Sequence, residues 1–348
     1  MKTGLSGYQQ RPYKASGCTK GLLVAAFLVS GCGSDNVSNK KVAISFANSS
    51  ASWQKNGNSV KEALENEGFH VDLQFADTDE QQIEQIKKMI QDHPGCLVIG
   101  AVNGEKLTEI LKDAKTENIP VIAYDRLIMN TDALSYYASF DNEAVGKAMS
   151  EYLVAALNLK SGAGPYNIEV FAGDPKDNNA HMFFTGSMEV LKPYFDNGQL
   201  VCRSNETSFE KAATKDWDGK NAQARMDKLI STYYADGNLA AVLAPNDGCA
   251  AGIRASLQAN YHGAWPLITG QDAEASAIEA IRAGTQAITI YKSSDDLNAK
   301  CIRMIKAVVE GTQPAINDKT TYNNGVMTVP AYLCIPMIID KDNTNLVK

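Results

Sequence analysis

The chain has 348 residues, of which 44% are hydrophobic and 21% are charged, and this composition is that of a globular protein. The length is enough for two hydrophobic cores of ordinary size, so we expect two domains. The formal net charge of −7, with lysines and arginines scattered along the chain, argues against a nucleic-acid-binding protein, because phosphate backbones repel an acidic surface.

The first 31 residues have the pattern of a secretory signal peptide. Basic residues precede a short apolar run, 22–29, which is too short to span a bilayer, and the small residues Ser30 and Gly31 lead into Cys32. The ending LVSGC resembles a bacterial lipobox, in which the cysteine is lipidated and becomes the mature N-terminus. An ordinary signal peptide with a chance cysteine is the alternative. Cys18 is the weaker candidate for lipidation, because no apolar run precedes it.

Cleavage before Cys32 would make the chain more acidic. It removes four of the 33 basic residues and none of the 40 acidic ones, so the mature net charge is −11. The stretch 32–40 is polar and without periodicity, and we predict that it forms a tether between the anchor and the first domain.

After this tether, strand patterns alternate with helix patterns. Apolar or alternating runs predict strands over 42–46, 71–75, 96–102 and 121–124. Apolar residues at helical spacing fill the intervals, and Thr78 with Gln81 has the spacing of a capping box. Strands that alternate with helices of about ten to fifteen residues indicate βαβ units, so the first half is predicted to be one doubly wound domain.

The alternation restarts after a long helix pattern over 144–157. Further strands are predicted over 168–172, 200–203, 240–244, 267–270 and 287–291. They supply a second sheet, so we predict an α/β protein with two doubly wound parallel-sheet lobes. The tail has a helix pattern over 297–309 and a strand pattern over 326–339, and the pattern alone does not assign them to a lobe.

Polar residues follow five of these strands at the point where each strand should stop. They are Asp125 and Arg126, the run Asp177 to Asn179, Asn246 and Asp247, Asp272, and Lys292. In an open parallel sheet, ligands bind outside the carboxyl ends of the strands, so these side chains point to a site for a small polar ligand. A helix cap or a turn is the alternative for any single residue of the set.

The chemistry of this set suits a neutral polyol. Its carboxylates can each accept hydrogen bonds from hydroxyl groups, and its cationic and amide groups can donate to hydroxyl and ring oxygens. The acceptors are Asp125 and Asp272, and the donors are Arg126, Lys292, Asn178, Asn179 and Asn246. Trp53 and Trp217 offer flat apolar faces to the C–H side of a pyranose ring.

Motifs for catalysis, cofactors or metals do not occur in complete form. The run Gly162 to Gly164 lacks the third glycine of a dinucleotide fingerprint, and no P-loop sequence is present. Ser52 to Lys55 matches SxxK, but no KTG follows. In the calcium-like run Asp216 to Gly219, the next residue, Lys220, would repel a cation. We therefore expect a protein that is not an enzyme and has no cofactor and no metal.

The cysteines beyond Cys32 are predicted to be small buried hydrophobes. Their number is odd and no two form a CxxC pair, which argues against a disulfide framework and against a metal site. They are Cys96, Cys202, Cys249, Cys301 and Cys334.

The chain resembles the bacterial periplasmic sugar-binding proteins of the ribose, xylose and galactose type, especially the xylose and multiple-sugar receptors. The most specific stretch is residues 170–195, VFAGDPKDNNAHMFFTGSMEVLKPYF. Supporting segments are DWDGKNAQARMD at 216–227, GQDAE at 270–274, ITIYK at 288–292 and YNNGV at 322–326. The similarity covers residues 42–343 and implies a type I periplasmic binding protein, in which two lobes are joined by a three-segment hinge.

The resemblance also implies the roles of residues at matching positions. It places Trp53, Asp125 and Arg126 in the first lobe, and Lys292 at the hinge edge. It places in the second lobe Asn178, Asn179, Trp217, Asn246 and Asp272. Ser52 departs from several relatives that carry arginine immediately before the tryptophan, so a contact to a sugar hydroxyl is missing here or is supplied otherwise.

Lobe boundaries follow from the same resemblance. The chain is expected to cross between lobes near 140–141, 291–293 and 324–326. These crossings give a first lobe of 41–140 plus 293–325, and a second lobe of 141–292 plus 326–348.

The function that these features imply is that of a lipid-anchored receptor on the periplasmic or cell-surface side of the bacterial cytoplasmic membrane. It would capture a monosaccharide, with D-glucose or D-galactose favoured, and deliver it to an ABC transporter permease. Binding of D-xylose or another pentose is one alternative. A role as the sugar-binding partner of a chemoreceptor or sensor kinase is another.

Overall fold

The computed structural model describes residues 39–48 and 50–347. The predicted signal peptide at 1–31, the lipidation site at Cys32 and most of the predicted tether lie outside the described residues. Within the described part of the chain, no helix is both long and apolar enough to cross a membrane.

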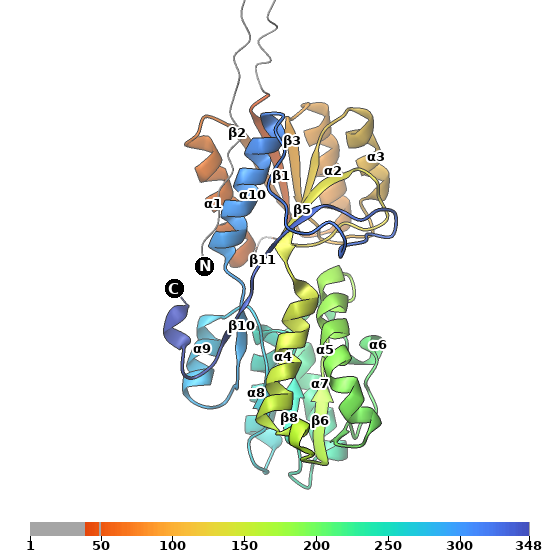
Figure 1. The fold of residues 1–348 in the computed structure, drawn as a ribbon, viewed down its shortest axis with the longest axis vertical. Coiled ribbons are helices and arrows are strands. Elements are labelled where there is room, and N and C mark those ends of the chain that lie inside the picture. The colour runs from red at the N-terminus through yellow and green to blue at the C-terminus, as the bar shows by residue number, and fades with distance from the viewer. Residues whose placement is uncertain (1–38, 49, 348) are drawn as a thin grey trace, which may run out of the picture. The chain divides into compact units, whose positions relative to one another are not determined.

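A parallel sheet forms the centre of the first lobe (Figure 1). Over the described residues, its strand order is β11-β5-β4-β3-β1-β2, and every neighbouring pair is parallel. Its strands are β1 (Lys41–Ala47), β2 (His70–Ala76), β3 (Cys96–Gly100), β4 (Val121–Tyr124), β5 (Leu134–Phe140) and β11 (Ala331–Cys334). Because the strands are parallel, their carboxyl ends lie along one edge of the sheet.

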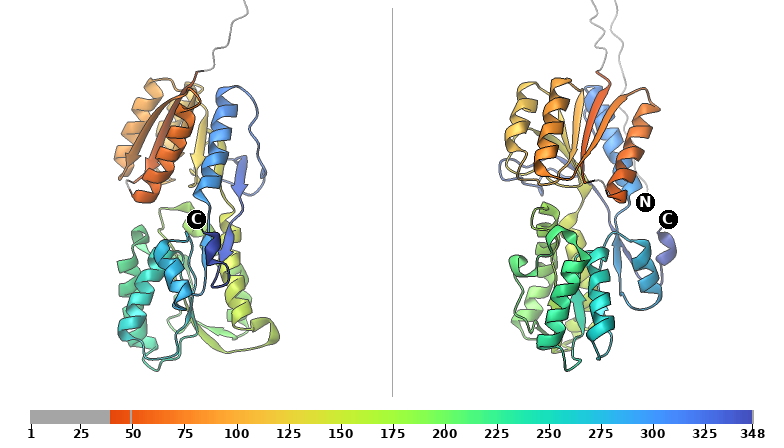
Figure 2. Two further views of the ribbon diagram at one scale, coloured as in Figure 1. Left: turned by 90° about the vertical axis from the view of Figure 1, so that its left-hand side faces the viewer. Right: turned by 180° about the vertical axis from the view of Figure 1, so that it is seen from behind.

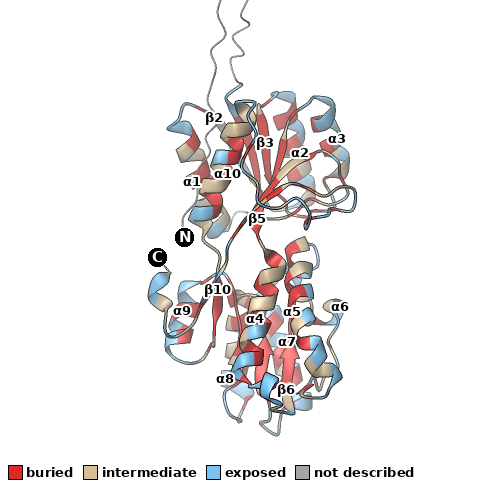
Figure 3. Cartoon of the chain, viewed as in Figure 1, coloured by how far each residue is buried: buried red, intermediate tan, exposed pale blue. Residues whose placement is uncertain are grey.

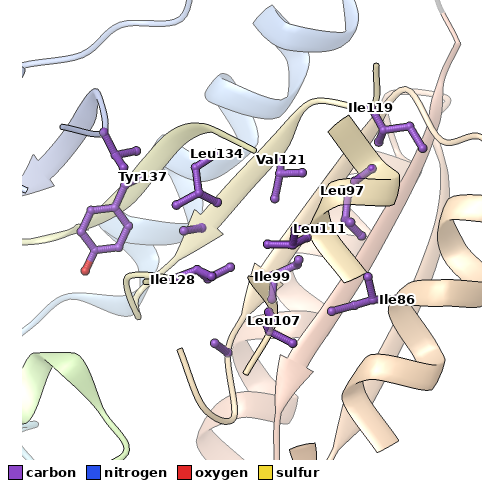
Figure 4. Close-up of a cluster of buried hydrophobic side chains, with 14 of the residues drawn as sticks. Ile86, Leu97, Ile99, Leu107, Leu111, Ile119, Val121, Ile128, Leu134 and Tyr137 are labelled. Carbon is purple, nitrogen blue, oxygen red and sulfur yellow. The ribbon is translucent and has the colours of Figure 1, made fainter. Parts of the chain in front are cut away.

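Both faces of this sheet are covered by helices, because its strands carry apolar side chains on both sides. On one face, Leu97 and Ile99 of β3 pack in a buried cluster with residues of α2 and α3 (Figure 4). On the other face, Cys96 and Val98 pack with residues of α1 and α10. These helices are α1 (Ala51–Glu65), α2 (Asp79–Gln91), α3 (Thr108–Thr116) and α10 (Ser294–Val309).

The second lobe repeats this plan. Its described strands form a parallel sheet of order β7-β6-β8-β9 and an antiparallel pair, β10 with β12. The strands are β6 (Tyr166–Val170), β7 (Leu200–Val201), β8 (Ala241–Leu243), β9 (Leu267–Ile268), β10 (Thr289–Tyr291) and β12 (Met337–Ile339). The predicted α/β fold with two parallel-sheet lobes is therefore confirmed.

Helices again cover both faces of the second sheet (Figure 2). One buried cluster joins it to α4 and α5, and another joins it to α7 and α8. The helices of this lobe are α4 (Asn142–Ala156), α5 (Asn178–Asp196), α6 (Phe209–Ala212), α7 (Gly219–Tyr233), α8 (Asp247–Asn260) and α9 (Ala275–Arg282), with short 3-10 turns η1 (Leu159–Ser161), η2 (Lys215–Trp217) and η3 (Thr344–Leu346). Buried positions follow the strands and the inner faces of the helices (Figure 3).

The predicted third crossing near 324–326 is wrong. The tail was predicted as one strand over 326–339, but it forms two strands in different lobes. β11 pairs with β5 in the first sheet, and β12 pairs with β10 in the second lobe. Pro336 lies between them, and a proline has no backbone N–H to continue a strand ladder. Residues 326–334 therefore belong to the first lobe, and the chain crosses at 335–336.

The strand β5 was not predicted. Its sequence, LSYYASF, alternates neither strictly nor as a continuous apolar run. It becomes a strand because β4 and β11 pair with it on either side.

The predicted N-cap of α2 is present, and the return bond of the predicted capping box is shifted by one residue. Thr78 is the N-cap, and its Oγ1 accepts a 3.2 Å hydrogen bond from the backbone N–H of Gln81. The Gln81 side chain reaches back and accepts a 2.9 Å bond from the backbone N–H of Asp77. The backbone N–H of Gln81, which the helix leaves without a partner, is thus satisfied, and so is the N–H of Asp77 just before the cap.

Thr78→Ala should lower the free energy of unfolding by about 1 kcal/mol, because it removes the cap. Urea denaturation followed by circular dichroism measures this change. The matched control is Thr116→Ala, since the Thr116 hydroxyl lies near the end of α3 and donates only to the carbonyl of Lys112. The control should change stability by less than about 0.5 kcal/mol. Equal effects of the two substitutions would contradict the capping role.

Candidate functional site

A cavity of about 860 Å³ lies at the carboxyl ends of strands from both lobes. All of the ligand-binding residues predicted from the sequence except Asn178 line it: Trp53, Asp125, Arg126, Asn179, Trp217, Asn246, Asp272 and Lys292. Asn178 and Asn179 are the first two residues of α5, and successive residues of a helix point in different directions. Only the second of them lines the cavity.

Trp53 forms an aromatic wall on the first-lobe side. Its ring makes edge contacts with Phe46 and Tyr124, at centroid separations of 5.3 and 6.0 Å. The ring also lies against Gly100, the last residue of β3, where a Cβ would overlap it. A glycine at the strand end therefore makes room for the tryptophan.

Trp217 repeats this arrangement on the second-lobe side. It belongs to η2, and its ring meets Phe183 edge-on at 6.4 Å. A Cβ on Gly173, just beyond β6, would overlap the Trp217 ring. Each tryptophan is thus placed by a glycine at the carboxyl end of a strand.

Asp125 stands at the end of β4 with its main chain held from three sides. Its φ of 61° is left-handed, which a non-glycine residue adopts only at a cost in energy. Its carbonyl oxygen accepts hydrogen bonds from the Tyr137 and Ser139 hydroxyls, each at 2.7 Å, and from the Asn179 amide at 2.9 Å. These bonds hold the turn and direct the side chain to the cavity.

Arg126 connects the two lobes. Its Nη1 donates to the carbonyls of Ala101 and Val102, at 3.1 and 3.4 Å. Its Nε lies 3.0 Å from a carboxylate oxygen of Asp177 in the second lobe, as an ion pair without the alignment of a hydrogen bond. The guanidinium also lies 5.5 Å from the centre of the Trp53 ring. Because both ions are largely buried, this pair holds Arg126 at the cavity wall.

Asn179 lies at the contact between lobes. Its Nδ2 donates to the carbonyl of Asp125, and its Oδ1 accepts from Asn142 Nδ2 at 2.9 Å. Most of its hydrogen-bonding capacity is therefore used within the protein. This residue joins the two halves of the cavity.

Asp272 and Lys292 form the charged pair on the second-lobe side. Lys292 Nζ lies 3.2 Å from Asp272 Oδ1, and it also lies over the rings of Phe183 and Phe140 at 5.2 and 6.0 Å. Burial alone would lower the pKa of Lys292, but the carboxylates of Asp272 and Asp125 outweigh it and the pKa is raised. The ammonium group therefore stays charged at neutral pH.

Burial raises the pKa of Asp125, and the nearby charge of Lys292 opposes the rise. The opposing cation matters because an isolated buried carboxylate would otherwise be driven to its neutral form.

Asn246 is both a helix cap and a residue of the cavity wall. It is the N-cap of α8, where its Oδ1 accepts a 2.9 Å hydrogen bond from the backbone N–H of Cys249. It also lines the cavity, where its Nδ2 group can donate a hydrogen bond to a ligand. The helix cap and the cavity contact use different atoms of one amide.

Several cavity residues were not singled out from the sequence. Asn48 and Asp77 directly follow β1 and β2, so the strand-end rule applied to the first two strands would have found them. Asp177 belongs to the predicted strand-end run but was not among the predicted hydrogen-bonding residues of the site. It is the N-cap of α5, and only the fold brings it to Arg126. The described residues contain no cluster of side chains that could hold a metal ion.

The fold and the cavity define a two-lobed solute-binding protein. Residues 42–313 match the family described as "Periplasmic binding protein domain". The chain therefore belongs to this family. The family consists of binding proteins, so the predictions of a periplasmic binding protein and of a protein that is not an enzyme are confirmed.

Similar proteins include the multiple sugar-binding periplasmic receptor ChvE of Rhizobium radiobacter, which is 44% identical over 299 residues, covering 84% of each chain. The D-xylose-binding periplasmic protein of Escherichia coli is 35% identical over 292 residues, covering 84% of this chain and 83% of the relative. A solved ABC transporter solute-binding protein from Clostridium phytofermentans, with bound β-D-glucose, is 42% identical with a TM-score of 0.85. It covers 88% of this chain and 96% of the solved chain.

Gly173→Ala should displace the Trp217 ring and lower stability by about 1–3 kcal/mol, because the added methyl group overpacks the contact. Tryptophan emission and urea denaturation measure the two effects. Gly248→Ala is the matched control in the same lobe, since its Cβ would meet no atom closer than 3.7 Å. In a Trp217→Phe background the emission change should vanish. An emission change that persists there would show that a different tryptophan responds.

Proposed function

We propose that this protein captures a monosaccharide in the cavity and delivers it to an ABC sugar permease, with D-glucose or D-galactose as the favoured ligand. The observation that carries the proposal is one cavity with a tryptophan on each side and two ion pairs between them, Arg126 with Asp177 and Lys292 with Asp272. Trp53 and Arg126 come from the first lobe, and Trp217, Asp272 and Lys292 complete the set.

The physical basis is the match between these groups and a sugar ring. Charge-assisted hydrogen bonds to hydroxyl groups are the strong kind, and aromatic faces cover the C–H side of the ring. A buried donor or acceptor left without a partner costs about 1–3 kcal/mol, so the site can reject a deoxy sugar or an epimer. Micromolar affinity needs about 8 kcal/mol, which a few such contacts supply.

The comparisons support a hexose more than a pentose. The solved relative from Clostridium phytofermentans holds β-D-glucose, and a second one, from Chloroflexus aurantiacus, is in complex with D-glucose at 29% identity and a TM-score of 0.79. D-xylose is the second candidate, because the relative from Escherichia coli is a D-xylose-binding protein. Mass spectrometry of the sugar that copurifies with the protein separates the two.

The partner that receives the sugar-bound form is a further part of the proposal. Transport to a permease is favoured because the relatives with bound glucose are solute-binding proteins of transporters. A chemoreceptor or sensor kinase is the second candidate, because the relative from Rhizobium radiobacter is named a receptor. A transporter ATPase and a permease encoded beside this chain would favour uptake.

Asp125→Ala and Asp272→Ala should each weaken sugar binding by about 100-fold or more while the protein stays folded, because each removes a charged acceptor from the cavity. Isothermal titration calorimetry with D-glucose, D-galactose and D-xylose measures the affinities. Asp132→Ala and Asp236→Ala are matched controls, since these carboxylates are on the surface and pair with Lys115 and Arg203. Near-normal affinity in both cavity variants would overturn the assignment of the site.

Cys32→Ala should move the protein from the membrane fraction to the soluble fraction of bacterial cells, because the lipidated cysteine would be the anchor. Immunoblotting of the separated fractions measures this change. Cys18→Ala is the control and should leave the protein with the membrane. If the protein with Cys32→Ala stays in the membrane fraction, Cys32 is not the anchor.

A further inference from the structure

The turn that carries Asp272 into the cavity is built from residues in an unfavourable backbone conformation. Asp272 and Ala273 have φ values of 96° and 52°, and neither is a glycine. Such a conformation persists only where the surrounding structure holds it.

Asp247, the first residue of α8, reaches the turn on both sides of Asp272. Its backbone N–H donates to the carbonyl of Gln271 at 3.0 Å, and its Oδ2 accepts from the backbone N–H of Glu274 at 3.0 Å. The same Oδ2 accepts from the Thr289 hydroxyl at 2.8 Å. Asp247 itself does not line the cavity and is fully buried.

Thr289 extends this contact to the middle of the turn. Its Oγ1 accepts a 3.1 Å hydrogen bond from the backbone N–H of Ala273 while its hydrogen is donated to Asp247. The backbone N–H of Asp272 donates to the carbonyl of Ile290, next to Thr289, at 2.8 Å. The N–H groups of Asp272, Ala273 and Glu274 are thus all held by β10 or Asp247.

The surroundings of Asp247 match an ionised carboxylate. Its Oδ1 accepts from Gln286 Nε2 at 2.8 Å, so it meets donors from Gln286, Thr289 and the Glu274 backbone. An ionised carboxylate only accepts hydrogen bonds, and each of these groups can donate to it. A Cβ on Gly270 would overlap both Asp247 and Gln286, so this glycine makes room for the contact.

Burial works against a charge on Asp247. Burial, with the neighbouring charge of Asp272, raises the pKa of Asp247 to about 7, and the hydrogen bonds from Gln286, Glu274 and Thr289 oppose the rise. Arg254 lies on the far side, where its guanidinium donates to Gln286. A carboxylate in this place is expensive for stability alone, which suggests a role at the site.

We propose that Asp247, acting with Thr289, is a positioning residue that holds the left-handed turn of Asp272 in the geometry that binds the sugar. The proposal rests on the proposed function, because it concerns the same cavity. It adds a residue that touches no ligand but sets the orientation of one that does.

The test is a double-mutant cycle of Asp247→Asn with Asp272→Ala, with sugar affinity measured by calorimetry and by NMR titration for the weak variants. Asp247→Asn keeps the volume but sets an NH2 group against hydrogen-bond donors. It should weaken binding about tenfold in the natural background and less than about twofold when Asp272 is already alanine. Equal losses in the two backgrounds would overturn the proposal, because they would show an effect that does not pass through Asp272.

Glu169→Gln is the matched control. Glu169 is a fully buried carboxylate of the same lobe, and it accepts from the Tyr234 hydroxyl at 2.6 Å and from the Ser204 hydroxyl at 2.7 Å. It does not line the cavity. Glu169→Gln should lower the free energy of unfolding without weakening sugar binding. A loss of affinity equal to that of Asp247→Asn would overturn the specific role of Asp247.

Thr289→Val and Thr289→Ser test the second contact and serve if Asp247→Asn does not fold. Valine keeps the branched shape without the hydroxyl and should weaken binding, whereas serine keeps the hydroxyl and should bind nearly as the natural protein does. Equal affinity of the two variants would contradict the proposal.

Hydrogen exchange of the Ala273 and Glu274 amides is a readout that needs no sugar. Exchange should become faster in Asp247→Asn than in Glu169→Gln. If the natural protein binds no sugar but these amides respond, the proposed function fails and the holding of the turn stands. If the amides do not respond, the positioning role fails whatever the ligand is.

Discussion

Parallel strands bring all their carboxyl ends to one edge of a sheet, and the rest of this structure depends on that constraint. In the first lobe, the edge places Asp125 after β4 and Gly100 at the end of β3. In the second lobe, it places Gly173 after β6 and Asn246 after β8. Residues at these two sheet edges line the cavity, so the direction of the strands determines where the cavity lies.

A second constraint is that charges at this cavity must be paired. Arg126 is held by Asp177 from the other lobe, and Lys292 is held by Asp272. An unpaired lysine or carboxylate in these partly dry positions would shift its pKa toward the neutral form, and a neutral group binds a hydroxyl more weakly. An unpaired arginine would stay charged, and its burial would cost stability. The two ion pairs therefore keep these side chains charged, and all four side chains still line the cavity, where a hydroxyl group of a ligand can reach them.

Strand-end residues were predicted well from the sequence because strand direction and strand ends are local properties. A run such as VIAY followed by Asp125 and Arg126 shows where β4 stops without any knowledge of its neighbours. Asn48 and Asp77 obey the same rule, since they follow β1 and β2 and line the cavity. The strand β5 could not be predicted in this way, since its pairing partners and not its own pattern make it a strand.

The sequence by itself determined the α/β class, the parallel sheets and the polar strand ends, because periodicity and turn chemistry are encoded within a few residues. Only the tertiary structure decided that Asp177 meets Arg126, that Asn179 meets Asp125 and that Asp247 holds the turn of Asp272. It also decided that the last crossing follows Cys334. These contacts join residues that are distant along the chain, and a pattern that repeats every two or four residues carries no record of such partners.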